Sequence, residues 1–243
     1  MSAEIFEGYV GIQFGYEQLI RDILFSVVFV LLICFAFIFR SHLPLFVKTI
    51  KGFISIKERQ NLFDPTMKEN LFFKSFLKLQ TLLLCAIFFY LIYITRFQIN
   101  DQTIISAFII LGLFLIVIIL FYFFKQCLYI FYGRVLCENN KYKLWYTNYD
   151  TLSYLWGISL YLPVLWLMFN NSSLKTVSFL FLFSYILYRI SVIYITIRIF
   201  YNKNGGILFL SSYLCAQEII PLLFLYEGLN YLQNVIETST LWH

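Results

Sequence analysis

Long apolar stretches alternate with short polar segments along this chain. Neither Ile23–Phe39 nor Gln102–Phe124 contains a charged residue. A helix that crosses a bilayer needs about 20 mainly apolar residues, and runs of this length favour helices over the shorter alternating strands of membrane barrels. The pattern predicts an all-α, polytopic transmembrane helical bundle that forms a single integral membrane domain over residues 1–243. It has about six spans, at 21–40, 77–96, 102–125, 151–171, 176–198 and 206–230.

The positions of Lys and Arg predict the orientation of these spans. Fourteen of the 18 basic residues lie in the segments that follow the first, third and fifth spans. The segments on the other side hold only Arg21, Arg96 and Lys175. Because basic residues are retained on the cytoplasmic side, this asymmetry predicts that both termini lie outside the cytoplasm.

Composition agrees with a lipid environment. Of the 243 residues, 61% are hydrophobic and 13% are charged, whereas a soluble domain averages about 45–50% and about 25%. The net charge of +5 does not indicate a nucleic-acid partner, because the charges lie between apolar runs as membrane topology requires. The expected partner is the lipid bilayer.

The segment 44–60 carries apolar residues mixed with Lys48, Lys51, Lys57 and Arg59 after Pro44. Pro is favoured in the first turn of a helix, so the segment is typical of an amphipathic helix in the membrane interface that begins at Pro44. The alternative is a basic loop with little structure that only sets topology. Residues 129–149 are expected to extend the third span into the cytoplasm.

Two opposite charges within the predicted spans form the main candidate site. Arg189 and Glu218 lie at similar depths in the fifth and sixth spans, which a short turn joins, so they are expected to form an ion pair. Pro221 cannot donate a backbone hydrogen bond, which leaves the carbonyl of Gln217 free beside Glu218. This polar site is either a structural lock between two helices or a contact for a solute.

Three other features of the last spans have simpler expected roles. Asp150 is expected to cap the start of the fourth span, where backbone amides are exposed. Pro163 is expected to interrupt that span by leaving the Ser159 carbonyl without its partner, close to Gly157. Glu227 is expected near the outer end of the sixth span, in reach of water.

The chain has no motif of a known catalytic centre. It lacks phosphate-binding, nucleophile-elbow, zinc-protease and dinucleotide fingerprints, and its only histidines are His42 and His243. The five cysteines form no C-x-x-C pair. No enzyme, catalytic residue, metal or cofactor is therefore expected, and a lipid-modifying enzyme is a remote alternative.

A resemblance rests on the run Ser212–Leu223, which reads SYLCAQEIIPLL. It is similar to the Y-L-C-[AT]-x-E-[IL]-[IL]-P-L pattern of domain of unknown function 4271, a family of uncharacterised integral membrane proteins of Bacteroidota. The resemblance implies an α-helical bundle in a bacterial inner membrane and a recurrent feature that includes Arg189, Glu218 and Pro221. It implies no activity.

Two functions remain open. The first is a non-enzymatic accessory or assembly protein of the inner membrane, whose partners would include other membrane protein subunits. The second is a small carrier or channel that uses the polar site at Arg189 and Glu218. A water-filled cavity that reaches Glu218 would favour transport, and a dry pair would favour a structural role.

Overall fold

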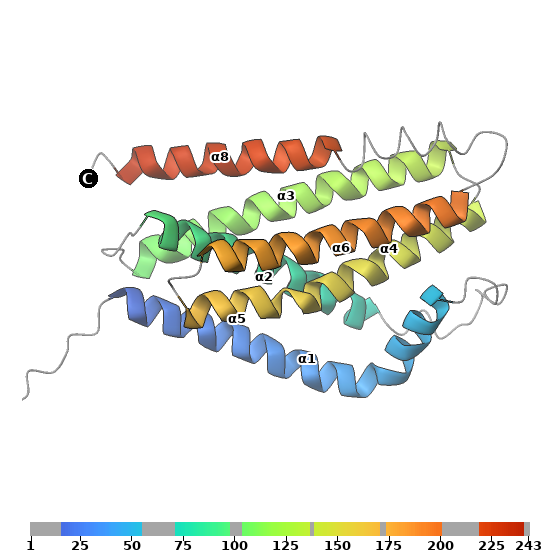
Figure 1. Cartoon of the computed structure of the whole chain (residues 1–243), viewed down its shortest axis with the longest axis horizontal. Coiled ribbons are helices and arrows are strands. Elements are labelled where there is room, and N and C mark those ends of the chain that lie inside the picture. Colours follow the sequence, from blue (N-terminus) through green and yellow to red (C-terminus); the bar gives the residue numbers. More distant parts are fainter. Residues whose placement is uncertain are drawn as a thin grey trace, which may run out of the picture.

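The computed structural model describes residues 16–54, 71–97, 104–136, 139–170, 174–200 and 219–240 as an elongated bundle of helices (Figure 1). No strand occurs in these ranges, so the predicted all-α class is confirmed. The helices are α1 (Tyr16–Ile54), α2 (Leu71–Phe97), α3 (Ile104–Leu136), α4 (Asn139–Ser159), α5 (Tyr161–Phe169), α6 (Leu174–Phe200) and α8 (Ile220–Thr240).

Five stretches of these helices are long and apolar enough to cross a membrane. They are Gln18–Arg40, Phe73–Arg96, Ile104–Phe131, Trp145–Phe169 and Leu174–Ile199. They overlap the first five predicted spans and differ from them at their ends. Of the sixth predicted span, 206–230, only residues 219–230 lie within the described ranges. They are Ile219 and the first half of α8.

The helix α2 lies at the centre of the bundle. Its buried side chains Leu84–Phe88, Tyr90, Leu91 and Tyr93 point in all directions around the axis, as is typical of a helix surrounded by protein. It packs against α3, α4, α5 and α1. The other spans turn large apolar side chains outward, among them Phe37 of α1 and Phe183 of α6. Lipid is the solvent that suits such a surface.

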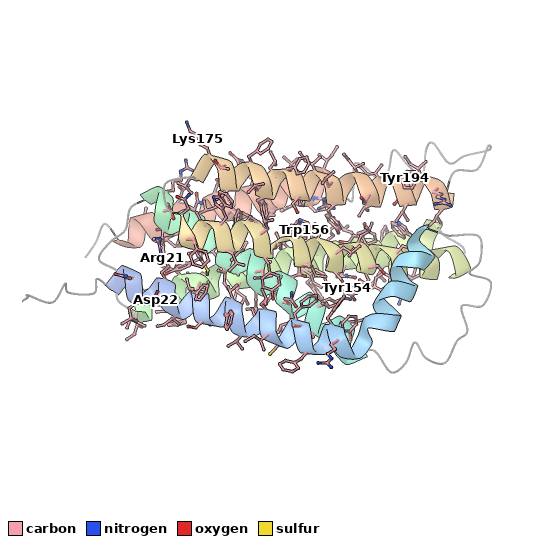
Figure 2. The ribbon with its side chains drawn as sticks, turned by 60° about the horizontal axis from the view of Figure 1, so that its bottom comes forward. Arg21, Asp22, Tyr154, Trp156, Lys175 and Tyr194 are labelled. Carbon is pink, nitrogen blue, oxygen red and sulfur yellow. The ribbon has the colours of Figure 1, made fainter. Side chains whose placement is uncertain are left out.

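Successive spans run in opposite directions, which gathers basic residues at one end of the bundle. Arg40 ends the apolar stretch of α1, and Lys74, Arg134 and Arg198 lie near the ends of α2, α3 and α6 that meet there (Figure 1). We call this the basic end. Arg21 and Lys175 lie at the opposite end (Figure 2), where α1 begins and α8 terminates.

Two prolines shape the helices in different ways. The helix α1 continues through Pro44 to Ile54 and bends in its last part (Figure 1), so the expectation that a separate helix begins at Pro44 is wrong. Pro44 cannot donate a backbone hydrogen bond, so the helix lacks one bond at this position. The helical turns before and after Pro44 keep theirs, and the helix continues. The fourth span is interrupted as predicted, since α4 ends at Ser159 and α5 begins at Tyr161. Pro163 cannot donate to the Ser159 carbonyl, whereas Val164 donates to Leu160 at 3.2 Å.

Candidate functional site

An ion pair between α2 and α4 lies inside the bundle, towards the basic end. Lys78 Nζ lies 3.2 Å from Asp150 Oδ2, and the two side chains are 27% and 10% exposed. Lys78 is in the second turn of α2, while Asp150 is midway along α4. Lys78 Nζ also lies 5.8 Å from the centre of the Tyr146 ring, so an aromatic face covers part of the ammonium group.

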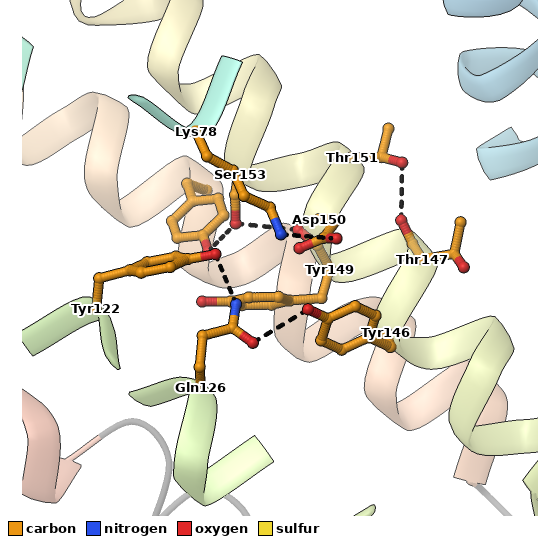
Figure 3. A network of polar contacts seen from close by, with 10 residues as sticks. Lys78, Tyr122, Gln126, Tyr146, Thr147, Tyr149, Asp150, Thr151 and Ser153 are labelled. Carbon is orange, nitrogen blue, oxygen red and sulfur yellow. Dashed lines mark hydrogen bonds and ion pairs between the residues drawn. The ribbon is translucent and has the colours of Figure 1, made fainter. Parts of the chain in front are cut away.

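Polar side chains of α3 extend this pair into a network (Figure 3). Gln126 Nε2 donates to the Tyr122 hydroxyl at 2.8 Å, and the Tyr146 hydroxyl donates to Gln126 Oε1 at 3.2 Å. Tyr122 points from α3 toward the ion pair. Three helices, α2, α3 and α4, therefore contribute polar groups to one centre.

The expectation that Asp150 caps a helix is wrong. The helix α4 begins at Asn139, so Asp150 lies three turns inside it, and its carboxylate reaches sideways to Lys78. The polar segment 139–150 is helical although it precedes the apolar run, because helix formation does not require an apolar sequence. Hydropathy locates where a helix enters lipid and gives no information about where the helix begins.

A second polar cluster joins α4 to α6 around Arg189. Arg189 Nε donates to the Tyr185 hydroxyl at 2.6 Å, and its guanidinium carbon lies 5.3 Å from the centre of the Tyr188 ring. The Tyr188 hydroxyl is 3.0 Å from Ser153 Oγ of α4, and Trp156 stacks on the Tyr188 ring. Tyr154 and Trp156 both lie within the bundle (Figure 2). Arg189 thus faces an aromatic surface inside the protein.

The predicted partner of Arg189 lies outside the described residues. Gln217 and Glu218 belong to the segment 201–218, so the Arg189–Glu218 ion pair stays a prediction. Pro221 occupies the first turn of α8, a position where a missing backbone donor costs little. Whether it frees the Gln217 carbonyl also stays a prediction.

A third contact fixes α4 against α6 close to the basic end. The indole Nε1 of Trp145 donates to Thr196 Oγ1 at 3.0 Å, and both residues are buried. Lys125 of α3 is buried beside them, with Nζ 6.0 Å from the Tyr129 ring centre and 5.7 Å from that of Tyr149. Aromatic rings therefore cover a second lysine in this half of the bundle, and this one is buried.

One close helix approach supports the ion pair. A methyl group at Gly157 of α4 would overlap the side chain of Thr81 of α2, whose hydroxyl donates to the Leu77 carbonyl at 2.8 Å. Small residues let helix axes approach in membrane proteins. Gly157 lies two turns from Asp150, so this contact sets the distance between α2 and α4 beside the pair.

The Lys78–Asp150 pair was not expected from the sequence, although its signal is present there. In the prediction, Lys78 is counted among the basic residues of the segment that follows the first span, and Asp150 is a cap at a helix start. Both lie about one turn inside their spans, at ends that the predicted topology places on the same side. Opposite charges at matching depth near one face of a membrane are candidates for a pair.

The polar contacts described above join the helices to one another. The described residues contain no group of three or more His, Cys, Asp or Glu side chains that could hold a metal ion. Cys34, Cys85 and Cys127 are free thiols.

Comparison with known proteins identifies a family and no closer relative. No curated protein and no solved structure shows significant similarity to the chain. The family "Domain of unknown function (DUF4271)" has a sequence model that matches residues 24–229. This range contains the spans α2 to α6, most of α1 and the first half of α8. It includes both charges of the pair, together with Arg189 and Glu218. The chain therefore belongs to the DUF4271 family.

Proposed function

We propose that this protein is a non-enzymatic accessory or assembly protein of the bacterial inner membrane. It contributes a rigid helical body and a basic cytoplasmic face to a larger membrane complex. The observation that carries the proposal is the direct contact between Lys78 and Asp150. A charge within a membrane span is costly and needs a partner or water, and here the two opposite charges satisfy each other.

Direct pairing supports a static role because a carrier must present its charges to a solute and move helices around it. The pair, the Gln126 network and the Trp145–Thr196 hydrogen bond together tie α2, α3, α4 and α6 to one another. A body tied in this way is suited to holding other subunits in position.

The cations at the basic end support a role in assembly with other proteins, as opposed to a helical bundle that works alone. Arg40, Lys74, Arg134 and Arg198 lie there on four different helices. The sequence adds the basic segment 44–60, of which 44–54 is the last part of α1. Clustered cations on a cytoplasmic face attract anionic headgroups and acidic protein surfaces.

Affinity purification of the tagged full-length protein from its native membrane tests the proposal. We expect a partner in stoichiometric amount. Replacing Lys48, Lys51, Lys57 and Arg59 with Gln is expected to release that partner. The matched control replaces Arg21, Arg96 and Lys175 with Gln at the opposite end, and it is expected to retain the partner.

The same material tests the carrier alternative. Purified protein that moves a solute across liposome membranes without any partner would overturn the assembly role. The absence of a stoichiometric partner from native membranes would also overturn it. Loss of solute movement in Arg189→Met would then assign transport to the polar site at Arg189.

A further inference from the structure

The position of α8 beside α3 fixes the depth of its residues in the membrane. Gly228 packs against Val117, since a methyl group at Gly228 would lie 3.9 Å from Val117 Cγ1. The rings of Phe224 and Phe124 lie 5.4 Å apart, which shows that the two helices run in opposite directions. Val117 is the fourteenth of the 28 residues in the span Ile104–Phe131. Gly228 therefore lies beside the middle of this apolar stretch.

Glu227 precedes Gly228 and so lies at mid-depth. This position differs from the expectation that Glu227 sits near the outer end of its span, because its neighbour Gly228 packs against Val117, midway along the apolar stretch of α3. Its carboxylate is on an exposed face of the helix. Among the residues that the structure describes, no ion pair or hydrogen bond of Glu227 is present.

Glu227 belongs to a polar stripe on the face of α8 that points away from α3. Pro221, Leu232 and Ile236 are buried on the inner side, and α3 is the main neighbour of α8. Glu227 and Asn234 are exposed on the outer side, with Asn230 half-buried between them. Their spacing of three and four residues places all three on one helical face, a seam that suits a second helix.

A stripe of this kind is incomplete without a partner. A carboxylate turned toward hydrocarbon at mid-depth is costly, and such residues ordinarily face a partner or water inside a protein. Asn side chains in a membrane span likewise form hydrogen bonds across helix interfaces. The outer face of α8 is therefore suited to protein contact more than to lipid contact.

The charges of the chain indicate which kind of helix would cover the stripe. A second copy packed by twofold symmetry would place two Glu227 carboxylates opposite each other. Among the described residues, the exposed Lys and Arg lie near the ends of the spans, and Arg189 faces Tyr185 and Tyr188. No exposed cation of the described helices is thus placed to meet Glu227 from a neighbouring copy.

We propose that the outer face of α8 docks a transmembrane helix of a different membrane protein, which presents a Lys or Arg at mid-depth to Glu227. Asn230 and Asn234 form hydrogen bonds with the same helix. This inference rests on the proposed assembly role and assigns that role an intramembrane contact surface. It adds to the contact made by the basic end.

Site-specific photo-crosslinking in native membranes tests the proposal on the full-length protein. A photoreactive residue replaces Tyr231, which is 73% exposed beside the stripe, and a matched control replaces Phe183, which is 52% exposed on α6. We expect Tyr231 to crosslink to a single membrane protein, within a helix that contains Lys or Arg. The Phe183 position is expected to give lipid adducts.

Substitution of Glu227 shows whether its charge makes the contact. Glu227→Leu is expected to lower the yield of the protein adduct about tenfold or more, because a buried cation of the partner then loses its counter-charge. Glu227→Lys is expected to abolish the adduct, and exchanging the partner's Lys or Arg for Glu is expected to restore it. An unchanged unfolding midpoint of Glu227→Leu in detergent shows that the helix bundle itself remains intact.

Three results would overturn the inference. They are crosslinks from Tyr231 to lipid alone, crosslinks to a second copy of the chain, and a protein adduct that Glu227→Leu leaves unchanged. A stoichiometric partner that still purifies with Glu227→Leu and fails to crosslink at Tyr231 would leave the assembly role standing and remove only the α8 contact. No partner in either experiment would remove both.

Discussion

Individual polar side chains in this protein stabilise the contacts between helices. Lys78 and Asp150 each need an opposite charge because both lie within membrane spans, and each is the partner of the other. A buried uncharged group likewise needs a hydrogen-bond partner. The buried indole N–H of Trp145 donates to the Thr196 hydroxyl. Removal of one partner is therefore more harmful than replacement of both.

Asp150→Asn tests the importance of the ion pair. It leaves the Lys78 ammonium without its counter-charge and is expected to lower the free energy of unfolding by about 3 kcal/mol. This is the low end of the range for buried pairs, since Lys78 keeps some access to solvent. The double variant Lys78→Met with Asp150→Leu should be more stable than Asp150→Asn. Chemical unfolding in detergent micelles measures both, and a double variant no more stable than Asp150→Asn would contradict the pairing.

Trp145→Phe tests the hydrogen bond between α4 and α6. The substitution removes the indole N–H, while the Thr196 hydroxyl still donates to the Val192 carbonyl at 2.9 Å. We expect a loss of about 1–2 kcal/mol, from one hydrogen bond and part of a buried ring. Trp166→Phe on the exposed surface of α5 is the control and should have little effect on the unfolding midpoint.

At the scale of whole helices, the apolar stretches were predictable and the helix ends were not. Span two was predicted at 77–96, and the apolar part of α2 is Phe73–Arg96. The helix α4 instead begins at Asn139, well before the predicted 151. The apolar run indicates which residues can transfer into lipid. The helix itself continues beyond that run for as long as its backbone hydrogen bonds and tertiary contacts favour the helical conformation. Pro163 did break its helix, and Pro44 only bent one.

Gly157→Ala tests the close approach of α2 and α4. Its methyl group would displace the Thr81 side chain, which would lose its hydrogen bond to Leu77 or push the helices apart. We expect a destabilisation of about 1–3 kcal/mol, with partial recovery when Thr81→Ala is added. Gly112→Ala on α3 is a matched control, because nothing lies within 4 Å of the added methyl group. That control should be neutral or stabilising, by up to about 1 kcal/mol from helix propensity. Equal effects at both positions would contradict the argument.

The whole molecule combines a central helix with an asymmetric distribution of charge. The helix α2 is surrounded by protein, while α1, α3 and α6 turn apolar surface outward. The described ends of α1 and α8 lie together, opposite the basic end, as the predicted orientation requires (Figure 1). By the positive-inside rule, we predict that the basic end faces the cytoplasm.

Cysteine labelling tests this orientation. In a variant without the five native cysteines, single cysteines at Arg134 and Arg198 are expected to react with a membrane-impermeant reagent only from the cytoplasmic side. Single cysteines at Arg96 and Lys175 are expected to react only from the outside. Labelling of Arg134 and Lys175 from the same side would contradict the orientation.

The sequence by itself determined that the chain is an all-helical bundle with long apolar spans, because transfer of about 20 apolar residues into lipid depends on local composition alone. It also determined the family, through a pattern in contiguous residues. Only the tertiary structure decided that Lys78 pairs with Asp150, that α2 is central and that Glu227 lies on an outward face of α8, beside the middle of the apolar stretch of α3. These properties depend on which helices are neighbours and on how each is rotated. Packing between segments far apart in the chain determines both, and no local stretch of sequence contains that information.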